Sequence, residues 1–92
     1  LTKRNGDVYE GVFKDGKMDG QVIIHYAGGA KFKGIYRNGK RNGAAIEETK
    51  DGTRFEGSYV DDRRDGNFVE KDRNGKVTAR GHYERGRRFV DK

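Results

Sequence analysis

Apolar and polar positions alternate along the first part of the chain, in the period of two that is typical of a half-buried β-strand. Tyr9, Gly11 and Phe13 occupy every second position of this segment. Residues 15–20 (DGKMDG) follow, and the Asp-Gly pairs in them favour a hairpin turn. Alternation then resumes and predicts a second strand over residues 21–26. The segment therefore predicts one β-hairpin with about seven residues in each strand.

The same pattern returns every 23 residues, which is the signature of a repeat array. The aromatic-glycine-aromatic pattern recurs at Phe32, Gly34 and Tyr36 and again at Phe55, Gly57 and Tyr59. A fourth copy follows after one inserted residue. It keeps the glycine and the second aromatic residue, Gly81 and Tyr83, but lacks the first ring. The repeats cover about residues 5–27, 28–50, 51–73 and, in partial form, 74–89. We expect residues 1–92 to form a single domain of these repeats.

Two segments depart from the pattern of the first repeat. Residues 44–49 (AAIEET) favour a helix by propensity, but Ala45 aligns with Val22 and Phe68, so we predict a strand. Turn formers at 72–75 lead to a final predicted strand over 77–84. We expect residues 85–92 to fray or to cover the end of the sheet.

Isolated hairpins are marginally stable in water, so the repeats are predicted to stack edge to edge. The expected fold is all-β: an elongated, single-layer antiparallel sheet of stacked β-hairpin repeats. Equivalent aromatic residues would form two rows across the sheet. Glycines between these rows would leave bare backbone over which the rings can lie. The rows are Tyr9, Phe32 and Phe55, and Phe13, Tyr36, Tyr59 and Tyr83.

The repeated pattern Tyr-Glu-Gly-x-Phe-x-x-Gly-x-x-x-Gly resembles the MORN (membrane occupation and recognition nexus) repeat. It occupies residues 9–20, 32–43 and 55–66. In the third copy Asp62 stands at the position of a turn glycine, and the fourth copy lacks both the leading aromatic residue and the final glycine. The fourth unit is either a degenerate repeat or a cap. The resemblance implies a stacked-hairpin fold, and the family name suggests membrane contact.

Bulk composition alone would place the chain near the disordered class, with 30% hydrophobic and 39% charged residues. The periodic placement of the apolar residues overrules that interpretation. There is no cysteine, so neither a disulfide framework nor a thiolate metal site is predicted. No secretory signal or membrane span is evident, which leaves a soluble or peripheral protein of undetermined compartment. Because the chain opens at Leu1, we expect it to be a piece of a longer protein.

No convergent set of catalytic residues is apparent, so we expect no enzymatic activity, cofactor, metal or small-molecule substrate. His25 and His82 fall on the second and seventh predicted strands, roughly 24 Å apart. Ser58 follows a glycine but lies in no nucleophile elbow. The acidic doublets 47–48 and 61–62 point their side chains to opposite faces of a strand and make poor ligand pairs. Glycines at 28–29 open no helix, as phosphate-binding loops require.

A row of cations is predicted along the hairpin turns, in a chain of net charge +6. Such a row can attract phosphate groups, or it can simply keep the turns solvated beside interleaved aspartates. We do not expect nucleic acid as the partner, because the aromatic residues are needed in the core and cannot stack with bases. The candidate anionic-lipid contacts are Lys14, Lys17, Arg37, Lys40, Arg41, Arg63, Arg64, Arg87 and Arg88.

Two hypotheses for function follow. The first is a scaffold that binds a partner protein, or another copy of itself, through its aromatic-lined face or its open edges. The alternative is peripheral binding to anionic phospholipid through the basic row, which lacks an accompanying hydrophobic anchor. The candidate partner face consists of Tyr9, Phe13, Phe32, Tyr36, Phe55, Tyr59 and Tyr83.

Overall fold

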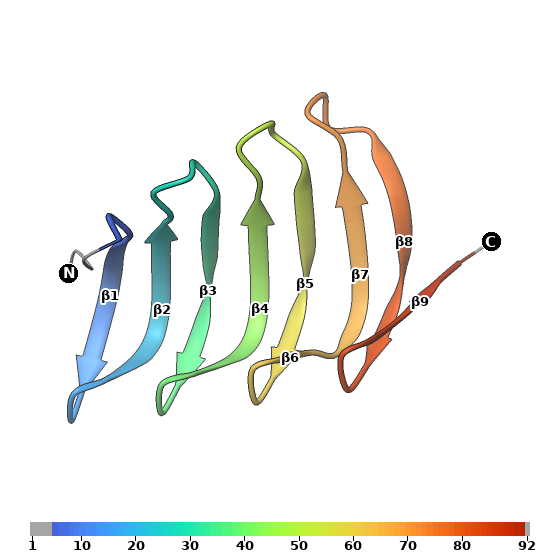
Figure 1. Cartoon of the computed structure of the whole chain (residues 1–92). Coiled ribbons are helices and arrows are strands. Elements are labelled where there is room, and N and C mark those ends of the chain that lie inside the picture. Colours follow the sequence, from blue (N-terminus) through green and yellow to red (C-terminus); the bar gives the residue numbers. More distant parts are fainter. Residues whose placement is uncertain (1–4, 92) are drawn as a thin grey trace.

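The structure is a computed structural model that describes residues 5–91, which form one open sheet of nine β-strands (Figure 1). The ends of the expected domain, residues 1–4 and 92, lie outside the described residues. No helix occurs within the described range. The strands are β1 (Val8–Lys14), β2 (Lys17–His25), β3 (Lys31–Arg37), β4 (Lys40–Glu48), β5 (Arg54–Val60), β6 (Arg63–Arg64), β7 (Gly66–Lys71), β8 (Val77–Glu84) and β9 (Arg87–Val90).

Apart from the short β6, strands that follow one another in sequence lie side by side, and all paired strands are antiparallel (Figure 1). The order across the sheet is β1-β2-β3-β4-β5-β7-β8-β9, and the two-residue β6 pairs with β5. The sheet measures 43 × 26 × 17 Å and is therefore elongated and thin. This architecture confirms the predicted all-β, single-layer antiparallel sheet of stacked hairpins.

Two-residue turns close the hairpins along one end of the sheet. Both residues of each turn have positive φ: 52° and 80° at Asp15-Gly16, and 48° and 70° at Asp61-Asp62. Such turns match the twist of the flanking strands. Aspartate tolerates this conformation better than most side chains do, which explains how Asp62 replaces the expected glycine without breaking the hairpin.

The second strand of the first hairpin is longer than predicted. β2 begins at Lys17, not at residue 21, because the turn uses only residues 15 and 16. The turn-forming residues 17–20 therefore belong to the strand, which passes through Gly20 at a φ of 101°. β4 repeats this arrangement and confirms that residues 44–48 are strand and not helix.

The C-terminal segment was expected either to fray or to cover the end of the sheet. Residues 87–90 do not fray but pair as β9 with β8, so they cover the edge that β8 would otherwise expose. The reason is local, since Arg85 and Gly86 adopt φ values of 50° and 87° and so reproduce the tight turn of the earlier repeats. The predicted final strand over 77–84 coincides with β8.

The hydrophobic core lies on one side of the sheet, which we call the core face. Gly34 pairs with Val22 on one side and Ala45 on the other, and the ring of Phe32 lies over it. A Cβ atom placed on Gly34 would stand 2.6 Å from Cζ of Phe32. This geometry confirms the predicted role of the strand glycines. The buried residues are Val22, Ile24, Phe32, Tyr36, Ala45, Phe55, Tyr59, Phe68 and Tyr83.

Replacing Gly57 by alanine is expected to destabilise the fold by about 1–3 kcal/mol, because the new Cβ would lie 2.6 Å from Cζ of Phe55. Gly28→Ala is the matched control, since a Cβ there meets no atom within 4 Å. The free energy of unfolding from urea denaturation, followed by circular dichroism, measures both. Equal stability of the two variants would contradict the packing of the ring over Gly57.

Candidate partner-binding surfaces

The aromatic rings predicted to face a partner are largely enclosed within the core face. Phe32 packs edge-to-face against Tyr36 at 5.9 Å and against Tyr59 of the next repeat at 6.1 Å between ring centroids. Phe55 contacts Tyr83 in the same way at 6.0 Å. These five rings are buried, whereas Phe13 is 45% exposed and Tyr9 half-buried. The surface that this set offers is therefore confined to β1.

Arginine side chains cover the rings where a second layer of structure would otherwise lie. The guanidinium of Arg64 stands 3.9 Å from the ring centroid of Phe55, and that of Arg41 stands 4.5 Å from Tyr59. Arg88 covers Phe68 at 5.0 Å. Cations over aromatic faces are attracted by the ring quadrupole, so the arginines both shield and stabilise the core.

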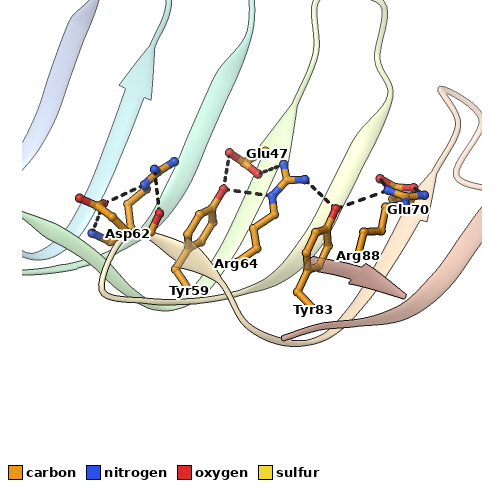
Figure 2. A network of polar contacts seen from close by, with 8 residues as sticks. Glu47, Tyr59, Asp62, Arg64, Glu70, Tyr83 and Arg88 are labelled. Carbon is orange, nitrogen blue, oxygen red and sulfur yellow. Dashed lines mark hydrogen bonds and ion pairs between the residues drawn. The ribbon is translucent and has the colours of Figure 1, made fainter. Parts of the chain in front are cut away.

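Carboxylates and tyrosine hydroxyls hold these arginines in place, as Figure 2 shows. Arg64 donates to Oε2 of Glu47 at 2.7 Å and to the hydroxyls of Tyr59 and Tyr83 at 3.2 and 3.0 Å. Tyr59 in turn donates to Oε1 of Glu47 at 2.9 Å. The same arginine therefore links the tyrosines of two successive repeats.

Two further arginines, Arg88 in the last hairpin and Arg41 in the second repeat, are held by fewer partners. Arg88 donates through two nitrogens to the carboxylate of Glu70, at 2.7 and 2.6 Å. At the other end, the backbone N–H and Nε of Arg41 both donate to Oδ1 of Asp62, at 2.8 and 3.1 Å. Both contacts are charge-assisted and the Arg88–Glu70 contact is also bidentate, which makes them the stronger kind of hydrogen bond.

These contacts shift the pKa values of the groups involved. The hydrogen bond from Arg88 lowers the pKa of Glu70, and the backbone N–H of Arg41 lowers that of Asp62. Burial acts to lower the pKa of Arg64, but its hydrogen bonds to Tyr59 and Glu47 outweigh burial and raise it. A carboxyl whose pKa is lowered on folding stabilises the fold above its ordinary value, 4.5 for Glu70, and this contribution is lost as acid protonates it.

Sequence reasoning missed the acidic partners, although a signal for them exists. Glu47 and Glu70 are one repeat apart, and the same position in the first repeat is Ile24. Met18 likewise stands where later repeats have Arg41, Arg64 and Arg88. Comparing repeats for pairs of positions that change together from apolar to charged would have indicated the ion pairs.

The predicted basic row divides into two groups. Arg41, Arg64 and Arg88 are engaged in ion pairs on the core face. The remaining members are exposed along the hairpin turns and form no ion pair within residues 5–91. This second group, which we call the turn cations, comprises Lys14, Lys17, Arg37, Lys40, Arg63 and Arg87.

The opposite side of the sheet, which we call the outer face, carries apolar side chains in contact with solvent. Successive strand residues point to opposite faces, so Ile35 and Ile46 project away from the core. They are 43% and 40% exposed. They line a shallow groove of about 600 Å³ together with Lys33, Ala44 and Glu56. Sequence reasoning did not single out this surface, because isolated isoleucines among polar residues give no local signal.

The family model for the MORN repeat matches residues 9–30, 32–54 and 55–76, most of the chain. The chain belongs to the MORN repeat family. MORN repeat proteins are generally non-catalytic scaffolds associated with protein and membrane-lipid interactions. No match to the chain was found among curated proteins.

The two histidines of this MORN sheet have different carboxylate neighbours. His25 lies 3.5 Å from Glu10, whereas His82 lies 3.4 Å from Glu84 and stacks on Phe89. Among residues 5–91 no three His, Asp or Glu side chains are grouped as metal ligands would be. The hydroxyl of Ser58 donates to the carbonyl of Asp65. In the same range, no helix has the length and apolar character to cross a membrane.

We expect Arg64→Ala to lower the free energy of unfolding by about 2 kcal/mol, because it removes both the cation over Phe55 and the charge-assisted bonds to Glu47. Arg63→Ala is the control, since the side chain of Arg63 is exposed and forms no ion pair within the described sheet. It should change stability by no more than about 0.5 kcal/mol. Urea denaturation compares the two, and equal losses would show that the arginine network does not stabilise the core.

Proposed function

We propose that this chain is a non-enzymatic MORN scaffold that binds a partner protein on its outer face. The observation that carries the proposal is the groove of about 600 Å³ around Ile35 and Ile46, two large aliphatic side chains in contact with solvent. Apolar surface bordered by charged residues is typical of protein-interaction sites. Lys33 and Glu56 border this groove.

The close packing of the core face supports this role. Partners bind with less loss of conformational entropy when the surface is already ordered. Here the core face is closed by its own rings and arginines, so the backbone under the groove is held from behind. The aromatic-lined face or the open edges were the expected contact surfaces, but the central rings of that face are occupied in packing against one another. The outer face has apolar side chains available for a partner.

Ile46→Glu is expected to reduce partner capture by at least about tenfold, since it introduces a charge into the apolar groove. Val60→Glu is the matched control: Val60 is on the neighbouring strand, points to the same face, is 50% exposed and does not line the groove. Both immobilised variants are compared with the wild type for saturable capture from extract of the source cells, competed by free wild-type chain. Equal capture by all three forms would exclude the groove as the binding surface.

A second candidate function is peripheral binding to anionic phospholipid through the turn cations. It is favoured by their placement on successive hairpin turns at one end of the strands, with no ion pair within residues 5–91. Charge near an anionic bilayer contributes about 1 kcal/mol per residue. Several turn cations acting together would hold the sheet on such a surface at low salt.

This second function predicts that changing Lys17, Lys40, Arg63 and Arg87 to serine weakens binding to phosphatidylserine vesicles by at least about a hundredfold. The control changes four exposed cations near the opposite ends of the strands, Lys31, Lys50, Arg73 and Lys76. Co-sedimentation at low and physiological salt measures binding. If the wild type does not pellet at low salt, or if both variants bind alike, the turn cations are not a lipid site.

A further inference from the structure

One row of side chains crosses the outer face through seven strands. Each member is the Cα partner of the next across the sheet, so the row runs at right angles to the strands. With about 4.8 Å between strands, it spans roughly 29 Å. In order from β1 to β8, this central row consists of Glu10, Ile23, Lys33, Ile46, Glu56, Val69 and Arg80.

The central row is antisymmetric in charge about Ile46. Aliphatic residues occupy alternate places, and the charges between them read minus, plus, minus, plus from one end to the other. A two-fold axis parallel to the strands and passing over Ile46 reverses the order of the strands. It brings Lys33 of one copy opposite Glu56 of the other. It also brings Glu10 opposite Arg80, and Ile23 opposite Val69.

We propose that two copies of the chain pack outer face to outer face about this axis. The proposal rests on the outer face being the binding surface of the proposed function, and it names a second copy as the occupant. A two-fold interface repeats each contact, so the row would form four opposite-charge pairs around a centre of two facing Ile46 side chains. Sheets that pack face to face lie about 10 Å apart, within reach of these side chains.

The charges of the row are available for such pairing. Lys33 and Arg80 form no ion pair within residues 5–91. Glu10 is exposed and has His25 as its neighbour at 3.5 Å. Glu56 already pairs with Lys71 at 3.1 Å and with Arg54 at 3.8 Å, but a carboxylate can accept from further donors. Two cations per copy thus lack a counter-ion that the second copy would supply.

The rows on either side of the central row set the limits of the interface. Toward the tight turns, positions 21, 44, 58 and 67 carry uncharged side chains that impose no electrostatic penalty. Toward the longer turns, Lys31 would face Arg54, but Arg54 is neutralised by Glu48 at 3.6 Å and Glu56 at 3.8 Å. The contact is therefore centred on Ile46 and the groove beside it.

Sedimentation equilibrium over a wide concentration range is the test, with a chain mass of 10.4 kDa as the monomer reference. We expect a reversible dimer. Lys33→Glu should weaken it by at least about tenfold, since like charges would then meet twice. Ile46→Glu should do the same, whereas Val60→Glu should have little effect.

Charge exchange provides the decisive measurement. Lys33→Glu combined with Glu56→Lys restores opposite charges across the axis and should return the dimer to within a few-fold of the wild type. Because Glu56→Lys removes the internal ion pairs with Lys71 and Arg54, the second exchange is Glu10→Arg with Arg80→Glu, at two exposed positions. The proposed axis is supported if Glu10→Arg and Arg80→Glu each weaken the dimer alone and the double variant restores it. Failure of rescue in a folded double variant overturns it.

The outcomes also separate this inference from the proposed function. A wild-type chain that stays monomeric at every concentration overturns the second copy as occupant. If that monomer still shows Ile46-dependent capture of another protein, the proposed function stands alone. A dimer that Ile46→Glu leaves intact overturns the face-to-face arrangement, whatever is captured.

Discussion

A single-layer sheet has no second layer to cover its apolar side. In this protein, arginine side chains cover that side instead. The rings of the core face are large enough to cover the strand glycines and one another, but their outward surfaces would meet water. Arg41, Arg64 and Arg88 lie over them. Their aliphatic stems and planar guanidiniums shield the rings while the charged atoms stay partly solvated. The ion pairs with carboxylates keep each arginine in that position.

This arrangement links successive repeats more closely than strand pairing alone. Backbone hydrogen bonds join neighbouring strands wherever their register permits, but Arg64 contacts Tyr59, Tyr83 and Glu47 from three different strands at once. A shift of one strand by a single residue would move these groups to opposite faces. The network therefore selects the register that the hairpin turns also favour, so local and long-range preferences agree.

Much of the fold could be predicted because its determinants are local and repeated. The tight turns, the alternation in each strand and the strand glycines depend on residues that lie close in sequence. The partners of the arginines could not be read in this way, since Glu47 and Arg64 are 17 residues apart and belong to adjacent repeats. The alignment of repeats placed Lys40 and Arg41 in one basic row, but alignment alone does not distinguish Lys40 in solvent from Arg41 on a ring. The groove around Ile46 was missed for a related reason, because exposure depends on what lies opposite.

The first repeat differs from the later ones in its core-face residues, so the two ends of the sheet are held by different kinds of contact. At the two positions where later repeats place arginine and glutamate, it has Met18 and Ile24. On the core face, contacts near β1 are thus apolar, while those toward β9 include ion pairs. High salt weakens the ionic contacts and strengthens apolar burial when the salt is a kosmotrope. A kosmotropic salt therefore stabilises the contacts at the β1 end of the sheet and weakens those at the β9 end. The salt in solution thus determines which end of the sheet unfolds more readily.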